Sequence, residues 1–296
     1  MSLSYEKCTL CAHKCGVNRT RGEVGYCGMT DKCVIARAAL HMWEEPIISG
    51  TCGSGTIFFS GCSLGCVYCQ NRAISRGDTG NPVSAQRLSD IMFELWELGA
   101  HNINLVTPTH FAKTVRKSLE IAKEKGLGIP IVYNTSSYDT VETIRAMDGL
   151  VDIYLPDLKY YLSKTSKALS FAENYPEAAK LAIAEMVHQR PEPIINDGIM
   201  SSGVIARILL LPSHVAEAKL SLKYLYSAYG DSIYISLMNQ YTPMKDMIPP
   251  LDRKVTRAEY SELLLYAEKL GVKNGFSQEF GTAEESFIPK FDNTGV

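Results

Sequence analysis

Runs of mostly apolar residues recur along the chain from about residue 55 onward. Six such runs stand out, at 56–60, 102–106, 130–134, 151–155, 204–211 and 232–238. Continuous apolar runs of this length are typical of parallel strands whose two faces are both covered. The pattern therefore predicts six buried strands.

Amphipathic stretches separate these runs. Apolar side chains at helical spacing predict helices over 85–98, 110–125, 164–190 and 215–229. Two pairs of residues resemble capping boxes that open helices, namely Asp139 with Glu142 and Thr256 with Glu259. Residues 191–203 contain clustered Pro, Gly, Asn and Ser, which predicts a long loop.

Strands that alternate with helices predict an α/β protein, built either as an open doubly wound sheet or as a barrel. We expect a partial (β/α)6 TIM-like barrel with an N-terminal Cys-rich extension. The predicted domains are a Cys-rich lobe over 1–50, the barrel over 51–276 and a C-terminal tail over 277–296. We expect this tail to cover a sheet edge or the barrel mouth.

The charge balance narrows the classes of partner. Thirty basic and 32 acidic residues leave a net charge of −2, so nothing indicates a nucleic-acid or an anionic-membrane partner. The N-terminus lacks the apolar core of a signal peptide, and no apolar stretch approaches the roughly 20 residues of a membrane span. We therefore expect a cytoplasmic protein.

Cysteine is the residue whose distribution is unusual. All nine cysteines lie between Cys8 and Cys69, and the 227 residues that follow contain none. An odd, one-sided set is a poor disulfide framework, whereas clustered cysteines in a reducing compartment are more often metal ligands or catalytic thiols.

Three cysteines follow the first predicted strand directly, in the segment GCSLGCVYCQN. Cys62, Cys66 and Cys69 have the spacing C-x3-C-x2-C, which wraps one loop around one face of a cluster. Three thiolates on a cubane of four irons leave one iron open for another ligand. A structural zinc site usually takes four ligands from two separated pairs, so the triplet favours a catalytic cluster. Tyr68 can present an aromatic face to a purine.

On these residues the sequence resembles the radical S-adenosylmethionine (SAM) superfamily, and within it the branch of pyruvate formate-lyase activating enzyme. The resemblance covers about 55–245. It implies that a 4Fe-4S cluster on the three cysteines reductively cleaves SAM to a 5′-deoxyadenosyl radical, which abstracts a hydrogen atom from the substrate. It also implies an electron donor such as flavodoxin or ferredoxin, and a glycyl-radical enzyme as partner.

The carboxyl ends of barrel strands are where ligand-binding residues gather. The candidate SAM-binding residues are Tyr68, Thr107, Thr109, Asn134, Ser136, Asp157, Lys159 and Arg207. Related enzymes carry a Gly-Gly-Glu motif after the second strand. Here Thr107-Pro108-Thr109 stands in its place, so the cofactor's amino group must be bound there by these threonines or by backbone carbonyls.

The later strand ends carry charge. By resemblance, the segment around Asn134 and Ser136 lies near the ribose and carboxylate of the cofactor. Lys159 pairs with that carboxylate, and Asp157 orients it or holds a cation. The alternative is that Asp157 caps a helix and Lys159 is solvated. Arg207 interrupts an apolar strand and needs a partner, either the cofactor carboxylate or an internal acid.

A second cysteine set precedes the barrel. Cys8, Cys11, Cys15 and Cys27 supply four thiols within 20 residues, enough to close the coordination sphere of an auxiliary zinc or iron–sulfur site. The spacing does not separate the two metals, and Cys33 or Cys52 can substitute for one ligand. The alternative is a set of reduced structural thiols.

Three functions are consistent with this pattern. The first is a radical SAM enzyme that activates a partner protein by forming a glycyl radical on it. The second keeps the radical chemistry but modifies a small molecule or peptide. The third is a non-enzymatic iron–sulfur electron carrier, which needs four ligands per cluster and no cofactor pocket. The three-cysteine loop and the polar strand ends favour an enzyme.

Overall fold

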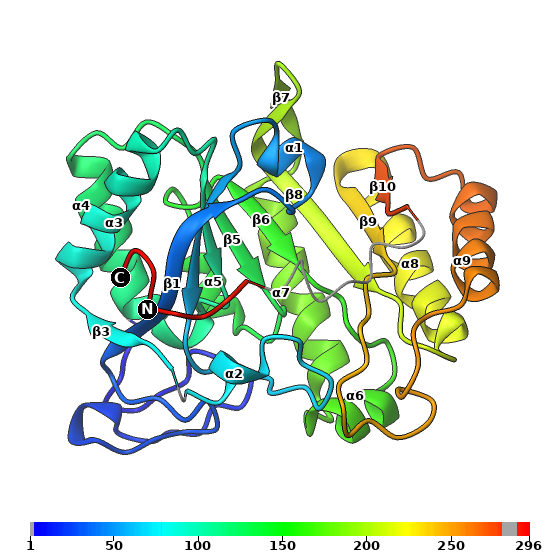
Figure 1. The fold of residues 1–296 in the computed structure, drawn as a ribbon, viewed down its shortest axis with the longest axis horizontal. Coiled ribbons are helices and arrows are strands. Elements are labelled where there is room, and N and C mark those ends of the chain that lie inside the picture. The colour runs from blue at the N-terminus through cyan, green and yellow to red at the C-terminus, as the bar shows by residue number, and fades with distance from the viewer. Residues whose placement is uncertain (1–2, 78, 280–288) are drawn as a thin grey trace.

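The fold is known from a computed structural model that describes residues 3–77, 79–279 and 289–296. A ten-stranded sheet dominates it, in the order β10-β9-β8-β6-β5-β4-β2-β1-β3, with β7 paired to β8 (Figure 1). The strands are β1 Cys33–His41, β2 Ser54–Phe59, β3 Asn81–Val83, β4 Ile103–Val106, β5 Ile131–Thr135, β6 Ile153–Pro156, β7 Ile194–Asn196, β8 Ile199–Leu209, β9 Tyr234–Met238 and β10 Gly275–Ser277.

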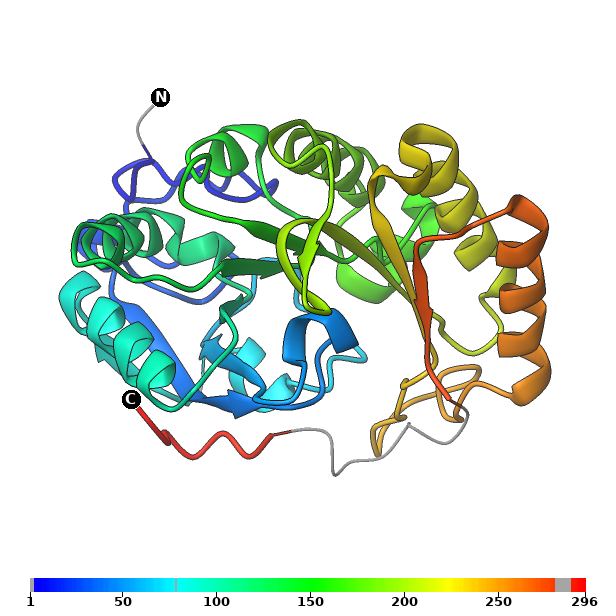
Figure 2. The same cartoon turned by 90° about the horizontal axis from the view of Figure 1, so that it is seen from above.

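The six predicted strands are confirmed as β2, β4, β5, β6, β8 and β9. Each pairs in parallel with the next in that order, and β10 adds a further parallel strand beside β9. Every residue of β2 and of β5 is buried, as expected of strands covered on both faces. The sheet is curved and carries helices around its outside (Figure 2), so the chain is an α/β protein with a partial barrel.

Helices connect the parallel strands. They are α1 Pro46–Ser49, α2 Arg72–Ser75, α3 Ala85–Glu97, α4 Ala112–Glu124, α5 Val141–Arg145, α6 Ser163–Ser170, α7 Tyr175–Gln189, α8 Val215–Tyr229 and α9 Arg257–Leu270, with 3-10 turns η1 Arg19–Arg21, η2 Thr109–Phe111 and η3 Gly230–Ser232. The predicted helix over 215–229 is confirmed, as is the capping box of Thr256 and Glu259. The predicted stretch 164–190 forms two helices, because Phe171 adopts a φ of 54° and ends the first.

The loop predicted over 191–203 is wrong. This segment forms the antiparallel hairpin of β7 and β8, which projects from one end of the sheet (Figure 1). Asp197 and Gly198 both have positive φ, 51° and 81°, as a two-residue hairpin turn requires. The Asp-Gly turn signal between isoleucines therefore outweighs the clustered loop-forming residues.

The capping box predicted for Asp139 is also wrong. Thr140 caps α5, and its hydroxyl accepts the backbone N–H of Thr143. The buried carboxylate of Asp139 instead accepts from the hydroxyls of Tyr133 (2.9 Å) and Thr135 (2.6 Å). Asp139 thus accepts hydrogen bonds from two hydroxyl groups of β5 in the barrel interior and does not cap the helix.

Both ends of the chain contribute to one edge of the sheet. β1 pairs antiparallel with β2, which places residues 33–41 in the same sheet as the barrel strands. The described part of the tail lies along β1. The Ala38 N–H donates to the Thr294 carbonyl at 2.9 Å, and Arg37 pairs with Asp292 at 2.8 Å. Residues 280–288 of the predicted tail lie outside the described residues.

None of the helices among the described residues combines the length and the apolar character that a membrane crossing requires.

Candidate active site

The loop after β2 holds three of the cysteines around two glycines. Gly61 and Gly65 have φ of 82° and 65°, a left-handed conformation that glycine adopts without strain. The turn directs the backbone N–H groups of Leu64 and Gly65 toward the Cys62 sulfur, at 3.4 and 3.5 Å. Two oriented N–H dipoles favour a negatively charged sulfur at this position.

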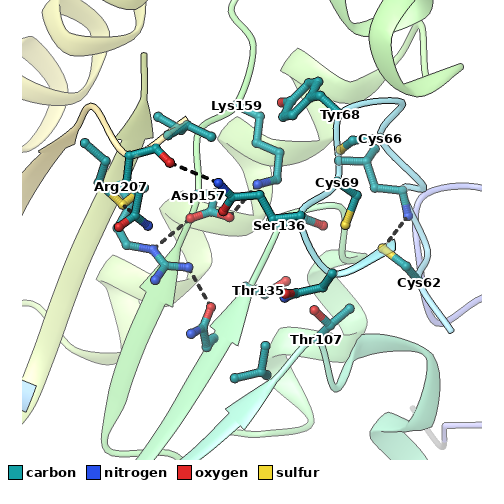
Figure 3. A pocket seen from close by; sticks show the side chains of 18 of the residues that line it. Cys62, Cys66, Tyr68, Cys69, Thr107, Thr135, Ser136, Asp157, Lys159 and Arg207 are labelled. Atoms are coloured by element: carbon teal, nitrogen blue, oxygen red, sulfur yellow. Dashed lines mark hydrogen bonds and ion pairs between the residues drawn. The ribbon is translucent and has the colours of Figure 1, made fainter. Parts of the chain in front are cut away.

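A cavity of about 240 Å³ opens beside this loop. Of the residues predicted for the central site, all but Thr109 line it: Cys62, Cys66, Tyr68, Cys69, Thr107, Asn134, Ser136, Asp157, Lys159 and Arg207. Figure 3 shows the cysteines on one side and Arg207 on the other, with Asp157 and Lys159 between them. Residues from strand ends far apart in the sequence thus face one space.

The two threonines after β4 have separate fates. Thr107 adopts a φ of 61°, and its N–H donates to the Asn134 carbonyl at 2.8 Å. The sharp turn leads into η2, which carries Thr109 away from the cavity into the core. There its Oγ1 lies 3.4 Å from Thr135 Oγ1. The prediction that Thr109 binds the cofactor therefore lacks the cavity contact that it needs.

Buried charges pair across the barrel interior. Asp157 accepts from Lys159 Nζ at 2.7 Å and from Arg207 Nε at 2.8 Å, while Arg207 also reaches Asn134 Oδ1 at 2.7 Å. Burial opposes ionisation of Asp157, yet the two cations hold its pKa below the usual value. The carboxylate is therefore ionised, and it is neither a helix cap nor a partner of a solvated lysine.

Glu44 completes this network and was missed in the sequence. It follows β1, and its carboxylate accepts from Asn104 (2.9 Å), Asn134 (3.3 Å) and Arg207 (3.2 Å). The partner that Arg207 needs is thus a pair of internal acids, Asp157 and Glu44. A buried arginine in an apolar strand signals an acid somewhere, but no local pattern points to residue 44.

The donor set fits an iron–sulfur cluster with SAM. All cysteines are free thiols, and burial raises the pKa of Cys62, and that of Cys69 to about 12. Metal binding displaces such protons. In the described part of the chain, no three His, Cys, Asp or Glu side chains converge on a single ion. A 4Fe-4S cluster does not require three ligands to converge on one ion, because each thiolate binds a different iron.

Ser136 gives a second indication of a ligand. Its hydroxyl is buried at the cavity wall and has no hydrogen-bond partner among the described residues. A buried polar group without a partner is costly, so such a group at a cavity indicates a bound partner. A hydroxyl or a carboxylate of a ligand would supply the hydrogen bond that the Ser136 hydroxyl lacks.

The N-terminal cysteines also gather in space. Cys8, Cys11 and Cys27 are buried and Cys15 is exposed. Burial raises the pKa of Cys11 to about 12, and a charge on any of the other three thiols would add to this shift. Cys52 is exposed beside His101, whose Nε2 accepts the Cys52 N–H at 3.2 Å.

Comparison with protein families and curated proteins gives two matches. The model of the radical SAM superfamily matches residues 56–191. The uncharacterized protein MJ0674 of Methanocaldococcus jannaschii is 29% identical over 275 residues, covering 90% of this chain and 75% of that protein.

Solved structures share the fold at low identity. SuiB of Streptococcus suis bound to S-adenosylmethionine aligns with a TM-score of 0.52 and 13% identity over 75% of this chain and 49% of that one. Methylornithine synthase (PylB) gives 0.51 and 16% over 73% and 60%. HydG, a maturase of the [FeFe]-hydrogenase, gives 0.50 and 13% over 76% and 52%. The chain thus spans about half the length of these proteins, and the likeness is one of fold.

Proposed function

We propose that this chain is an enzyme of the radical SAM superfamily with a 4Fe-4S cluster and SAM as cofactors, that Cys62, Cys66 and Cys69 hold the cluster, and that the adjoining cavity binds SAM. One observation carries the assignment. The three thiols line the same cavity as the buried ion pairs of Asp157 and the unpartnered hydroxyl of Ser136.

Together the cofactors supply one-electron cleavage of a sulfonium and hydrogen-atom abstraction from a substrate. The chain's own residues bind and orient them. Lys159 presents a cation toward the cavity, aimed by its 2.7 Å contact with Asp157, and suits the cofactor carboxylate. Tyr68 is held edge-on between Tyr160 and Tyr241, at 6.4 and 6.1 Å, which fixes its ring beside the third thiol.

The missing Gly-Gly-Glu motif has a local substitute in this proposal. The Thr107 N–H is occupied by the Asn134 carbonyl, whereas the Thr107 side chain lines the cavity. We therefore assign the contact with the cofactor's amino group to the Thr107 hydroxyl or carbonyl oxygen. Thr109 has no part in it.

The substrate proposed first is a small polar molecule or a polar residue of a peptide. His41 and Glu44, both from the segment before β2, line the same cavity as the three thiols. These groups can hydrogen-bond a polar substrate.

The second candidate is activation of a glycyl-radical enzyme. It is favoured by the segments around Cys66 and at Asp157-Leu158-Lys159, which resemble those of pyruvate formate-lyase activating enzyme. The cavity would then receive the glycine of a partner protein. The two candidates differ in where the abstracted hydrogen comes from.

A surface hollow on the outer side of the loop suits an electron donor. Cys66 lines both this hollow and the inner cavity, and the exposed Arg72 and Arg76 lie around it with Phe171. Two arginines and one aspartate, Asp246, line the hollow, so its net charge is positive and favours a donor with an acidic face. We propose that flavodoxin or ferredoxin docks here, where Cys66 separates the hollow from the inner cavity.

Anaerobic turnover tests the function. The full chain is reconstituted with iron and sulfide, reduced with dithionite and given SAM, and 5′-deoxyadenosine is measured by chromatography. Wild type and Cys52→Ala should form it and Cys66→Ala should not. Failure of cluster-loaded wild type to form it would refute the proposal.

Deuterium separates the two substrates. Transfer of deuterium to 5′-deoxyadenosine from a labelled small molecule or peptide supports the first candidate. An EPR doublet on an added glycyl-radical protein supports the second.

A further inference from the structure

Arg19 is a buried cation outside the cavity described above. Its side chain is fully buried in η1 and donates to the backbone carbonyls of Thr30 and His110. Among the described residues, no aspartate or glutamate forms an ion pair with it. A buried charge without an opposite charge is strongly unfavourable, so this guanidinium indicates an anion nearby.

Aromatic rings compensate only part of the positive charge of Arg19. The guanidinium carbon lies 4.6 Å from the Tyr5 ring centre and 5.5 Å from that of Phe111, close enough for cation–π attraction. The remaining neighbour is sulfur. Arg19 Nη1 lies 3.8 Å from Cys8 Sγ, and Cys27 is within electrostatic range of the same guanidinium.

Tight turns bring the N-terminal cysteines together. Cys8, Cys11 and Cys15 lie on one short loop, which the Gly16 N–H closes by donating to the Cys8 carbonyl at 2.9 Å. Cys15 reaches the turn that carries Cys27, because a Cβ added at Gly25 would lie 2.6 Å from Cys15 Sγ. Cys11 is within electrostatic range of all three other thiols. Two neighbouring turns thus hold all four thiols near one another, although no three of them converge on a single ion position in this structure.

We propose that Cys8, Cys11, Cys15 and Cys27 bind a second metal centre as thiolates, and that Arg19 is its buried counter-charge. Four thiolates around zinc, or on an iron–sulfur cluster, leave a negative net charge. That charge supplies the anion that Arg19 lacks when the thiols are neutral. Metal binding would draw the sulfurs inward from the separated positions that they have here.

The other two cysteines do not belong to this set. Cys52 is exposed beside His101, on the far end of β2. Cys33 is buried in β1, and the four N-terminal thiols are not among the groups that affect it. The ligand set is therefore the four thiols of the first 27 residues.

The proposed centre is in contact with the catalytic loop. A Cβ added at Gly61 would lie 2.9 Å from the Cys27 carbonyl oxygen and 2.4 Å from Met29 Cγ. Gly61 directly precedes Cys62. The turn after Cys27 therefore supports the start of the loop that carries Cys62, Cys66 and Cys69.

The test uses the full chain with Cys62, Cys66 and Cys69 all changed to Ala, which removes the catalytic cluster whatever its function. This variant is incubated anaerobically with Zn²⁺, or with Fe²⁺ and sulfide, desalted, and analysed for metal and sulfide. We expect about one zinc per chain without sulfide, or an iron–sulfur cluster with sulfide. Either result supports the centre and tells the two metals apart. A metal-free chain under both conditions would overturn it.

Matched variants in the same background assign the ligands. Cys11→Ser should lose the metal and Cys52→Ser should retain it. Co²⁺ substitution of the triple variant gives a readout that does not depend on a ligand variant folding, since thiolate coordination produces a charge-transfer band. Co²⁺ bound without that band would refute thiolate ligation.

Arg19 has its own test. Arg19→Leu should lower metal retention against a competing chelator by about 10- to 100-fold, whereas Arg19→Lys should lower it less. Retention by Arg19→Leu equal to that of the parent would exclude the counter-charge role.

Discussion

Two cysteine sets, separated in sequence by β1, α1 and β2, have opposite surroundings. Cys62, Cys66 and Cys69 line an open cavity whose other walls carry Ser136 and the ion pairs of Asp157. The four N-terminal cysteines enclose no comparable polar cavity in the described chain. Their charged neighbour is Arg19, which is sealed from solvent.

On the proposed assignments, this difference in surroundings distinguishes a reactive metal centre from a structural one. Three thiols leave a cluster with an open iron, and polar groups around that opening can bind and orient a cofactor. In the proposed second centre, four thiolates would complete the coordination of the metal, and the buried Arg19 would balance their charge without offering a site for substrate. Thiol number and neighbouring charge thus carry information that cysteine spacing alone does not.

The largest expected difference in activity is between two variants that each remove one thiol, one from each cysteine set. Cys66→Ala should abolish SAM cleavage, because the cluster loses one of three ligands. Cys15→Ser should keep cleavage per cluster-loaded chain within about tenfold of wild type, since second sites act indirectly. The measurement is 5′-deoxyadenosine formed per catalytic cluster. Equal loss in both variants, with the three-thiol cluster intact in Cys15→Ser, would erase the functional distinction.

Arg207 tests the charged wall of the open centre. Arg207→Leu leaves Glu44 and Asp157 without their shared cation, and should lower the free energy of unfolding by about 3–5 kcal/mol. Arg145→Leu breaks the exposed pair with Glu185 and should cost only about 0–1 kcal/mol. Urea denaturation of both variants measures this. Similar small costs would mean that the buried network contributes little.

Gly61 tests the contact between the two regions. Gly61→Ala meets the Cys27 carbonyl and Met29 besides the strain of a left-handed residue, and should destabilise the chain by about 2–4 kcal/mol. Gly99→Ala has a similar φ of 93° with open space around it, and should cost about 1–2 kcal/mol. Denaturation midpoints give the comparison. No extra loss at Gly61 would indicate that the regions are not tightly packed.

His110 gives the smallest effect and one that depends on pH. Burial lowers its pKa from 6.5 to about 3, so the folded chain holds fewer protons here than the unfolded chain between those values. Stability should therefore fall as pH drops below about 6.5, by about 2 kcal/mol at pH 5. His110 links the regions, because its carbonyl accepts from Arg19 and its Nε2 contacts the Ser60 carbonyl at 2.7 Å.

The control for this pH dependence is His110→Gln, in which that part of the loss between pH 7 and pH 5 should disappear. The exposed His188→Gln should retain it. Urea midpoints at both pH values measure the difference. An unchanged pH response in His110→Gln would exclude His110 as its source.

The sequence predicts the parts of this molecule that depend on local pattern. Apolar runs predict six of the seven described parallel strands, all but the short β10, and helical spacing predicts α8 to the residue. The hairpin over 191–203 was missed because loop-forming residues at its ends obscured the turn at Asp197 and Gly198. Periodicity therefore predicts most of the strands and helices, whereas the missed hairpin depends on a single turn.

The candidate site divides in the same way. Residues at strand ends were predictable because parallel strands end at one edge of a sheet. Glu44 was not, since it lies 163 residues before Arg207 and reaches it through the antiparallel strand β1. Thr109 does not line the cavity, because one left-handed residue at Thr107 turns the chain inward.

The tail on β1 also bears on the order in which the protein is made. Pro289 lines the cavity, and residues 292–294 bond to β1. During translation all nine cysteines leave the ribosome more than 200 residues before this wall of the cavity exists. On the growing chain the thiols are therefore present while the cavity still lacks the wall that Pro289 supplies.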